Sequence, residues 1–328
     1  MPLKKLYKEN NREGLVMRLI KLLPLLTLII FSLSCKAQER LENTMQEKAV
    51  VLSSYSSEKP AKPVNILFIH HSTGGHLLAE KGVYDGENCI YKSHPNGGGL
   101  RKLLLDNNYI VHEASYKSKV GDKTDICDWN AKFRDHMDLV LSCRGQDEFF
   151  QDGTHNSIVI FKSCFPNNWI QYDGEHPGNP DSCEKTLANA QTAYRALLPR
   201  FMAQPDTLFV VMTAPPMAKP VLYKKDRIKE TIKVVFGRPD TVEKIGKRAR
   251  FFNNWLKDAD NGWLKDYKLK NVVVFDYYDI LTGYGKSDWS VYPTRGGLDS
   301  HPSSEGNSIA AKEFIPFLNK AYHRHRAY

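Results

Sequence analysis

Ser72 and His301 are residues whose types and surroundings fit a nucleophile and its base. Ser72 follows an apolar run at 64–70 and precedes two glycines, while His301 stands in a late Asp-Ser-His-Pro segment. A hydroxyl nucleophile needs a base that takes its proton and a carboxylate that orients this base. We therefore predict acyl transfer, with Ser72 as nucleophile, His301 as general base and Asp299, two residues earlier, as orienting acid.

Acyl transfer also needs hydrogen-bond donors for the oxyanion that forms on the substrate. The backbone amides of Ser72 and Gly121 are candidate donors. The side chain of Asn167 or Asn168 is a further candidate, because both follow the apolar run at 157–162. His71, the neighbour of the predicted nucleophile, is expected to line the pocket.

These residues also have purely structural interpretations. Ser72 and Asp299 could each cap a following helix, since Ser and Asp are favoured at helix N-caps. Gly121 could serve only a turn. Ser163, at the end of another apolar run, is a weaker rival nucleophile.

Metal ions, cofactors and nucleic acid are not predicted. Three histidines lie close together, but His71 and His76 are not on one helical face and no nearby carboxylate completes a ligand set. The net charge is +9, of which +5 falls in the first 40 residues, leaving a body that is only mildly basic. Neither a zinc-finger spacing nor a basic helix is present.

Short apolar runs and helical stretches alternate through the body of the chain. We predict strands at 64–70, 109–113, 157–162, 207–213 and 271–276, and helices at 98–106, 183–202, 241–258 and 304–323. Near-continuous apolar strands are typical of a parallel sheet that is buried on both faces. This order predicts an α/β fold, a flavodoxin-like three-layer α/β/α sandwich with about five parallel strands. Ligands bind such sheets at the carboxyl ends of the strands, where the candidate residues lie.

The order of these motifs resembles the SGNH (GDSL-type) hydrolase superfamily over about residues 64–322, in a divergent exported bacterial branch. The segment 68–74 (FIHHSTG) resembles the first family block, which carries the nucleophile, and 299–302 (DSHP) resembles the last. Gly121 is similar in place to the glycine of the second block. The resemblance implies a serine esterase, a hydrolase of carboxylic ester bonds. Its expected substrate is an acylated, above all acetylated, carbohydrate or another ester.

The sequence departs from the family pattern at three places. His70-His71 replaces the usual Gly-Asp before the serine. The last block reads Asp-x-His, whereas the family pattern is Asp-x-x-His. The Gly-x-Asn-Asp block would fall on 162–165 and is not present, so Asn167 or Asn168 is the candidate for its asparagine. Two alternatives therefore stay open, a catalytically silent glycan-binding relative and a lipase-like or phospholipase-like lipid esterase.

The N-terminus predicts export. Residues 22–33 form an apolar run of about twelve residues after Arg18 and Lys21, too short to span a bilayer but typical of a secretory signal. Two processing sites are open, lipidation at Cys35, which would anchor the protein to the outer membrane, or cleavage after Ala37. We predict a signal peptide at 1–37, with Met17 as an alternative start, a polar linker at 38–62 and the hydrolase-like domain at 63–328. The protein would then be periplasmic, an outer-membrane lipoprotein or secreted.

The composition, with 41% apolar and 25% charged residues, is typical of a globular protein and excludes a disordered, collagen-like or multi-span membrane protein. Beyond Cys35 the chain has an odd number of cysteines, so at least one stays unpaired within a single chain. These are Cys89, Cys127, Cys143, Cys164 and Cys183. Their pairing and the oligomeric state cannot be read from the sequence.

Overall fold

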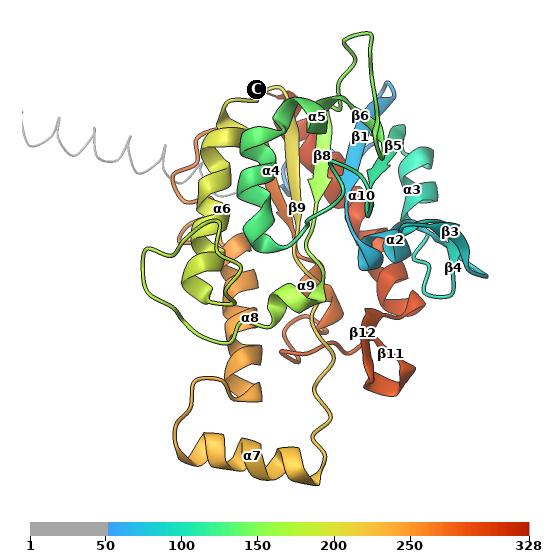
Figure 1. Ribbon diagram of the computed structural model, residues 1–328. Helices are drawn as coiled ribbons and strands as arrows, with labels where there is room; N and C mark the ends of the chain where they lie inside the picture. Colours follow the sequence, from blue (N-terminus) through green and yellow to red (C-terminus); the bar gives the residue numbers. More distant parts are fainter. Residues whose placement is uncertain (1–51, 328) are drawn as a thin grey trace, which may run out of the picture. The chain divides into compact units, whose positions relative to one another are not determined.

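The computed structural model describes residues 52–327, which belong to one compact unit (Figure 1). Its centre is a five-stranded sheet in the order β10-β9-β8-β1-β5, in which all neighbouring strands are parallel. The strands are β1 (Val64–Ile69), β5 (Tyr109–Ala114), β8 (Ile158–Phe161), β9 (Leu208–Met212) and β10 (Val272–Phe275). All five lie where the sequence predicts them. Counted along the chain from one edge, their order is 2-1-3-4-5, which is the flavodoxin-like arrangement.

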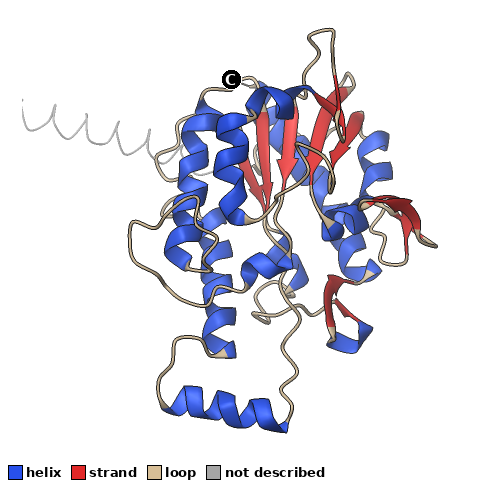
Figure 2. Ribbon diagram, in the orientation of Figure 1, coloured by secondary structure: helices blue, strands red, loops and turns tan. Residues whose placement is uncertain are grey.

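Helices cover both faces of this sheet (Figure 2). One face carries α4 (Trp129–Asp135), α5 (Met137–Ser142), α6 (Leu187–Met202) and α8 (Val242–Lys257). The other carries α2 (Ser72–Leu78), α3 (Leu100–Asp106), α9 (Tyr277–Leu281) and α10 (Ser304–Arg326). Successive strand side chains point to opposite faces, so Leu67 and Ile69 enter one core while Ile66 and Phe68 enter the other. The predicted three-layer sandwich is confirmed.

Several shorter elements were not predicted from the sequence. A three-stranded sheet follows α2, two small hairpins follow α5 and α9, and a helix stands between β9 and α8. They are β2 (Glu80–Lys81), β3 (Asp85–Glu87), β4 (Ile90–His94), β6 (Cys143–Gly145), β7 (Glu148–Phe149), α7 (Lys224–Val235), β11 (Pro293–Thr294) and β12 (Asp299–Pro302). Most of their residues are polar or exposed. They therefore lack the hydrophobic periodicity by which the larger elements are recognised.

The described part of the predicted linker, residues 52–62, lies on the domain rather than apart from it. Asn319 Nδ2 donates a hydrogen bond to Ser57 O at 2.8 Å, and Asn108 Nδ2 donates to Pro60 O at 2.7 Å. Leu52 packs against the core on the α10 side. Backbone carbonyls and one apolar side chain thus attach residues 52–62 to the domain.

The predicted signal peptide at 1–37, with Met17, Cys35 and Ala37, lies outside the described residues. Among residues 52–327, no helix is both long and apolar enough to cross a membrane.

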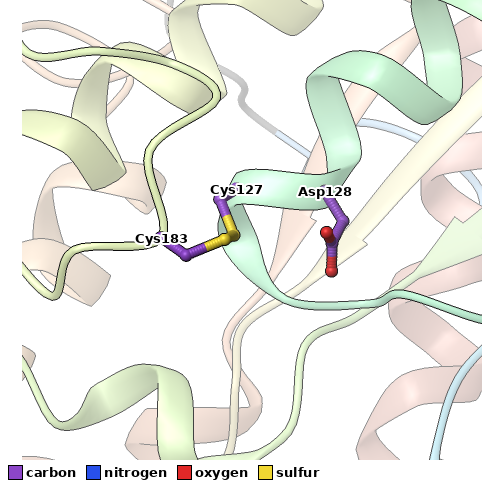
Figure 3. Close-up of side chains that lie close together, drawn as sticks. All are labelled: Cys127, Asp128 and Cys183. Atoms are coloured by element: carbon purple, nitrogen blue, oxygen red, sulfur yellow. A yellow bond between two sulfur atoms is a disulfide. The ribbon is translucent and has the colours of Figure 1, made fainter.

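One disulfide, Cys127–Cys183, joins the short helical turn before α4 to the segment that leads into α6 (Figure 3). Cys89, Cys143 and Cys164 are free thiols. Asp128 lies next to the disulfide, and its carboxylate accepts the backbone N–H of Asp125 at 3.0 Å. Since the two sulfur atoms are bonded to each other, they offer no thiolate to a metal ion.

Candidate active site

The structure brings Ser72, His301 and Asp299 together, although 229 residues separate the serine from the histidine. Ser72 Oγ lies 3.1 Å from His301 Nε2, and His301 Nδ1 lies 2.7 Å from Asp299 Oδ1. The backbone N–H of His301 also donates to Asp299 Oδ1 at 3.0 Å. The carboxylate therefore fixes the Nδ1–H tautomer and leaves the Nε2 lone pair for the serine hydroxyl.

The Asp299 carboxylate stays ionised in this arrangement. Partial burial disfavours the charged form, but hydrogen bonds from the backbone and ring of His301 outweigh it and hold the pKa of Asp299 below its usual value. The two side chains keep about a quarter of their surface exposed, 27% for Asp299 and 25% for His301. Substrate can therefore reach the histidine from solvent.

The fold explains where Ser72 lies. It is the first residue of α2 and follows β1, whose neighbours in the sheet are β5 and β8. The chain order reverses at this point of the sheet, which opens a crevice at the carboxyl ends of the strands. Gly74 lets α2 begin directly against β1, because a Cβ at Gly74 would meet the His70 side chain at 2.3 Å.

A buried lysine and a thiol lie beside Ser72, from the loop that follows β8. Lys162 Nζ donates to Thr73 Oγ1 at 2.5 Å, and Thr73 Oγ1 lies 3.4 Å from Cys164 Sγ. Cys164 Sγ in turn lies 3.6 Å from Ser72 Oγ. Sequence reasoning did not identify these side chains, although they occupy the place where the family's third block would fall.

The charges of this lysine and thiol depend on each other. Complete burial lowers the pKa of Lys162, while the nearby cysteines raise it. For Cys164, burial disfavours the thiolate, but Lys162 and the neighbouring hydroxyls of Thr73 and Ser72 lower its pKa below the usual thiol value. The structure thus places a thiol with increased thiolate character next to the predicted nucleophile.

His70, two residues before the serine, forms a second imidazole–carboxylate pair with Glu113 of β5. His70 Nε2 is 3.1 Å from Glu113 Oε2, and His70 Nδ1 is 3.1 Å from the carbonyl oxygen of His71. Arg101 Nε donates to Glu113 Oε1 at 3.0 Å. Burial disfavours the charged form of Glu113, but His70 and Arg101 outweigh it and lower its pKa.

Gly121 lies near the site but its amide is engaged. The Gly121 N–H donates to Ser118 Oγ at 2.9 Å, and its carbonyl accepts from His71 Nε2 at 2.8 Å. A Cβ at this position would lie 2.0 Å from Ser115 O, so the glycine permits a close approach of two backbone segments. Gly121 is therefore connected to the site by the hydrogen bond of its carbonyl to His71. The geometry gives no support to its amide as an oxyanion donor.

Both candidate asparagines are used to hold loops together. Asn167 Nδ2 donates to Asp125 Oδ1 at 2.7 Å, and its side-chain oxygen accepts the Ile126 N–H. Asn168 Nδ2 donates to two carbonyls, Ala214 O at 2.8 Å and Pro215 O at 2.9 Å. Both side-chain amides are therefore engaged with other groups of the loops.

His71 lines the site as a neutral ring. Its imidazole stacks on Tyr116 with ring centroids 3.6 Å apart. Burial lowers the pKa of His71 to about 4, despite the hydrogen bond to Gly121. The ring of His76 lies 5.0 Å from that of His301 and stacks on His94 at 3.8 Å, and burial together with His94 lowers the pKa of His76 to about 3. Uncharged rings therefore border the serine and histidine.

Two of the surface cavities differ in their relation to this site. A cavity of about 870 Å³ lies between the 117–123 loop, α4 and the disulfide, and none of its lining residues belongs to the Ser72–His301–Asp299 group. A smaller one of about 400 Å³ borders the histidine loop at Ser300 and is lined by apolar groups of Trp169, Met217 and Leu298. The three residues do not line the second cavity either, but Ser300, which lies between Asp299 and His301 in the chain, belongs to its wall.

Neither a family model nor a curated protein matches the sequence. Solved structures that it resembles include a catalytic mutant of an acetylxylan esterase from Geobacillus stearothermophilus, with 14% identity, a TM-score of 0.39 and coverage of 80% of this chain and 96% of that chain. Another is a carbohydrate esterase family 2 enzyme with a carbohydrate binding domain from Corynascus thermopiles (Myceliophthora fergusii), with 12% identity, a TM-score of 0.36 and coverage of 81% and 68%. The strand order of this chain agrees with the flavodoxin-like sandwich predicted from the sequence.

Proposed function

We propose that the protein is a serine esterase that acts by an acyl-enzyme mechanism. The observation that carries the proposal is the continuous line of contacts from Ser72 Oγ to His301 Nε2 and from His301 Nδ1 to Asp299 Oδ1, at 3.1 and 2.7 Å. His301 takes the hydroxyl proton as Ser72 attacks the ester carbonyl, and then gives it to the departing alcohol. Water, deprotonated by the same histidine, attacks the acyl-enzyme and releases the acid and free Ser72.

The oxyanion of each tetrahedral intermediate needs a donor, and we assign the backbone N–H of Ser72 to this role. Among residues 52–327 this N–H has no hydrogen-bond acceptor. It belongs to the residue whose side chain attacks, so it lies close to the developing charge.

We propose an acylated carbohydrate, with acetyl as the acyl group, as the substrate class. The rings around the serine support this choice, because His71 and Tyr116 stack and Phe165 lies edge-on to His301 at 5.0 Å. Aromatic faces pack well against sugar rings. The imidazole of His71 is neutral, and a neutral ring suits an uncharged polyhydroxyl ligand better than a protonated ring would.

We also propose that the protein works outside the cytoplasm, either in the periplasm, on the outer membrane as a lipoprotein, or secreted. The signal-like segment at 22–33 supports export. The Cys127–Cys183 disulfide supports it independently, since such bonds persist in oxidising compartments.

The direct test is hydrolysis of a short-chain aryl acetate by the chain from residue 38 and by its Ser72→Ala form. We expect turnover that Ser72→Ala abolishes while the melting temperature stays unchanged. Ser163→Ala is the matched control, because Ser163 Oγ accepts a hydrogen bond from Trp129 Nε1 at 2.9 Å and is fully buried. Equal turnover by wild type and Ser72→Ala would overturn the proposal.

A catalytically silent glycan-binding relative is the second candidate, and the engaged amides of Asn167 and Asn168 favour it. It predicts polysaccharide binding that persists in Ser72→Ala, with no hydrolysis of any acetylated glycan by the wild type.

A lipid esterase is the third candidate. The apolar lining of the cavity beside Ser300 favours it. It predicts that turnover rises with the length of the acyl chain, whereas the carbohydrate proposal predicts a preference for acetyl.

A further inference from the structure

Helix α7 (Lys224–Val235) stands out because it contributes no residue to either hydrophobic core. It lies between the loop that follows β9 and the start of α8 (Figure 1). Amphipathic helices of globular proteins normally turn their apolar side to the core and their charged side to water. In α7 this orientation is reversed.

The polar side of α7 anchors it to the domain. Glu230 Oε1 accepts the backbone N–H of Val242 at 2.6 Å, and Lys233 Nζ lies 2.9 Å from Asp240 Oδ2. Both partners lie at the start of α8, so the side of α7 that carries Glu230 and Lys233 faces the chain leading into α8.

The apolar side faces solvent. Ile228, Ile232 and Val235 follow at spacings of four and three residues, which places them in one stripe along the helix. They are 56%, 51% and 74% exposed, and Phe236, which ends the helix, is 76% exposed. On a helical wheel of 3.6 residues per turn, this stripe is opposite the anchored side.

Basic side chains flank the apolar stripe. Lys224, Lys225, Arg227 and Lys229 are exposed on and beside it. With Lys233 they outnumber the two acidic residues of α7, Asp226 and Glu230, by five to two. An exposed apolar stripe with basic flanks fits an apolar surface that carries negative charge. A second copy of α7 would instead bring like charges together.

We propose that α7 docks on the surface of a bilayer that contains anionic lipid. Ile228, Ile232 and Val235 enter the boundary between headgroups and acyl chains, and the flanking lysines lie against lipid phosphates. Val221 and Tyr223, in the segment directly before α7, line the cavity that borders Ser300. Docking would therefore hold the edge of the domain that carries the histidine loop at the membrane surface.

The test is co-sedimentation of the chain from residue 38, which lacks Cys35, with vesicles. Vesicles of phosphatidylcholine mixed with phosphatidylglycerol are compared with vesicles of phosphatidylcholine alone. We expect binding to the anionic vesicles that weakens as salt is added, because the charge contacts are screened. The triple variant Ile228→Ser/Ile232→Ser/Val235→Ser and the double variant Lys224→Glu/Lys225→Glu should each lower the partition coefficient at least about tenfold.

Matched controls carry equivalent changes elsewhere. Leu105→Ser replaces an equally exposed apolar residue on α3, and Lys312→Glu replaces an exposed lysine on α10, and both should bind like wild type. Equal binding to the two kinds of vesicle, or undiminished binding of the triple variant, would overturn the proposal. A third result would also overturn it: the wild type dimerises in a concentration-dependent way, the triple variant stays monomeric, and neither binds vesicles. The partner of α7 would then be a second copy of the chain.

Discussion

The two imidazole–carboxylate pairs beside Ser72 have the same chemical groups and opposite surroundings. His301 and Asp299 keep about a quarter of their side-chain surface exposed, and the second ring nitrogen of His301 meets the serine hydroxyl. His70 is completely buried, Glu113 is 9% exposed, and the second ring nitrogen of His70 meets a backbone carbonyl. A carbonyl oxygen only accepts hydrogen bonds, so it has no proton that the ring could take.

This difference determines what each pair can do. His301 has a nitrogen that faces a hydroxyl and can take its proton, as a general base must. Both nitrogens of His70 face oxygen atoms of Glu113 and His71 rather than the serine hydroxyl, and Arg101 adds a further donor to Glu113. We therefore expect the exposed pair to govern turnover and the buried pair to govern stability.

The largest expected effect comes from Asp299→Asn. Without the carboxylate, His301 loses the group that fixes its tautomer, and turnover of the aryl acetate should fall by about 10²–10⁴-fold. The melting temperature should change little, because Asp299 is partly exposed. Steady-state kinetics and thermal unfolding check both expectations, and unchanged turnover would remove Asp299 from the mechanism.

Glu113→Gln should show the opposite behaviour. Removing one partner of a buried charge network leaves His70 and Arg101 uncompensated, so the free energy of unfolding should fall by about 3 kcal/mol. Turnover by the folded fraction should stay within about tenfold of wild type. Denaturant unfolding followed by circular dichroism measures the free energy of unfolding, and kinetics at low temperature measure the turnover of the folded fraction.

The dependence of the free energy of unfolding on pH gives a second test of Glu113. Because the folded protein lowers the pKa of Glu113, the stability that the carboxylate contributes is present above the usual carboxyl pKa and is lost as the pH falls through the folded-state value. Wild type should thus lose stability more steeply than Glu113→Gln below about pH 5. If the free energies of unfolding of wild type and Glu113→Gln fell in parallel as the pH was lowered, the assigned role of Glu113 would be wrong.

Asn168→Ala tests whether this asparagine belongs to the site or to the scaffold. Its amide holds Ala214 O and Pro215 O, so we expect a loss of about 1–2 kcal/mol in stability with unchanged kcat. An oxyanion donor would instead lower kcat by about 10²–10³-fold with little change in stability. The same two measurements, kinetics and unfolding, separate these outcomes.

The smallest expected effect concerns the thiol beside the serine. The pKa of Cys164 is lowered, whereas burial raises the pKa of Cys89, which is also half-buried. Cys164 should therefore react with iodoacetamide faster than Cys89 at neutral pH, and Lys162→Met should slow its reaction about tenfold. Peptide mass spectrometry after timed alkylation measures this, and equal rates at the two thiols would contradict the influence of Lys162.

The parts of the fold that sequence reasoning identified share one property, a strong hydrophobic pattern. Each central strand is a short apolar run, as in β9 (Leu208–Met212), where all five residues are buried. The Ser72, His301 and Asp299 positions were identifiable because the ends of such strands and helices place them at one edge of the sheet. The contact between Ser72 and His301 is nevertheless a tertiary feature that only the structure shows.

The features that were missed depend on contacts that no local pattern records. Lys162 looks like an exposed charge in the sequence, yet it is completely buried against Thr73. Asn167 and Asn168 look like available donors, but distant backbone segments use their amides. Helix α7 has no buried side, so the periodicity that reveals a core-facing helix does not predict it.

The central claim is that Ser72 is a nucleophile activated by His301, and covalent labelling tests it most directly. The chain from residue 38 is treated with a fluorophosphonate, which reacts with activated serines, and the modified residue is found by peptide mass spectrometry. We predict a single adduct on Ser72 that His301→Ala prevents. A labelled Ser163, or labelling of Ser72 that persists unchanged in His301→Ala, would contradict the account.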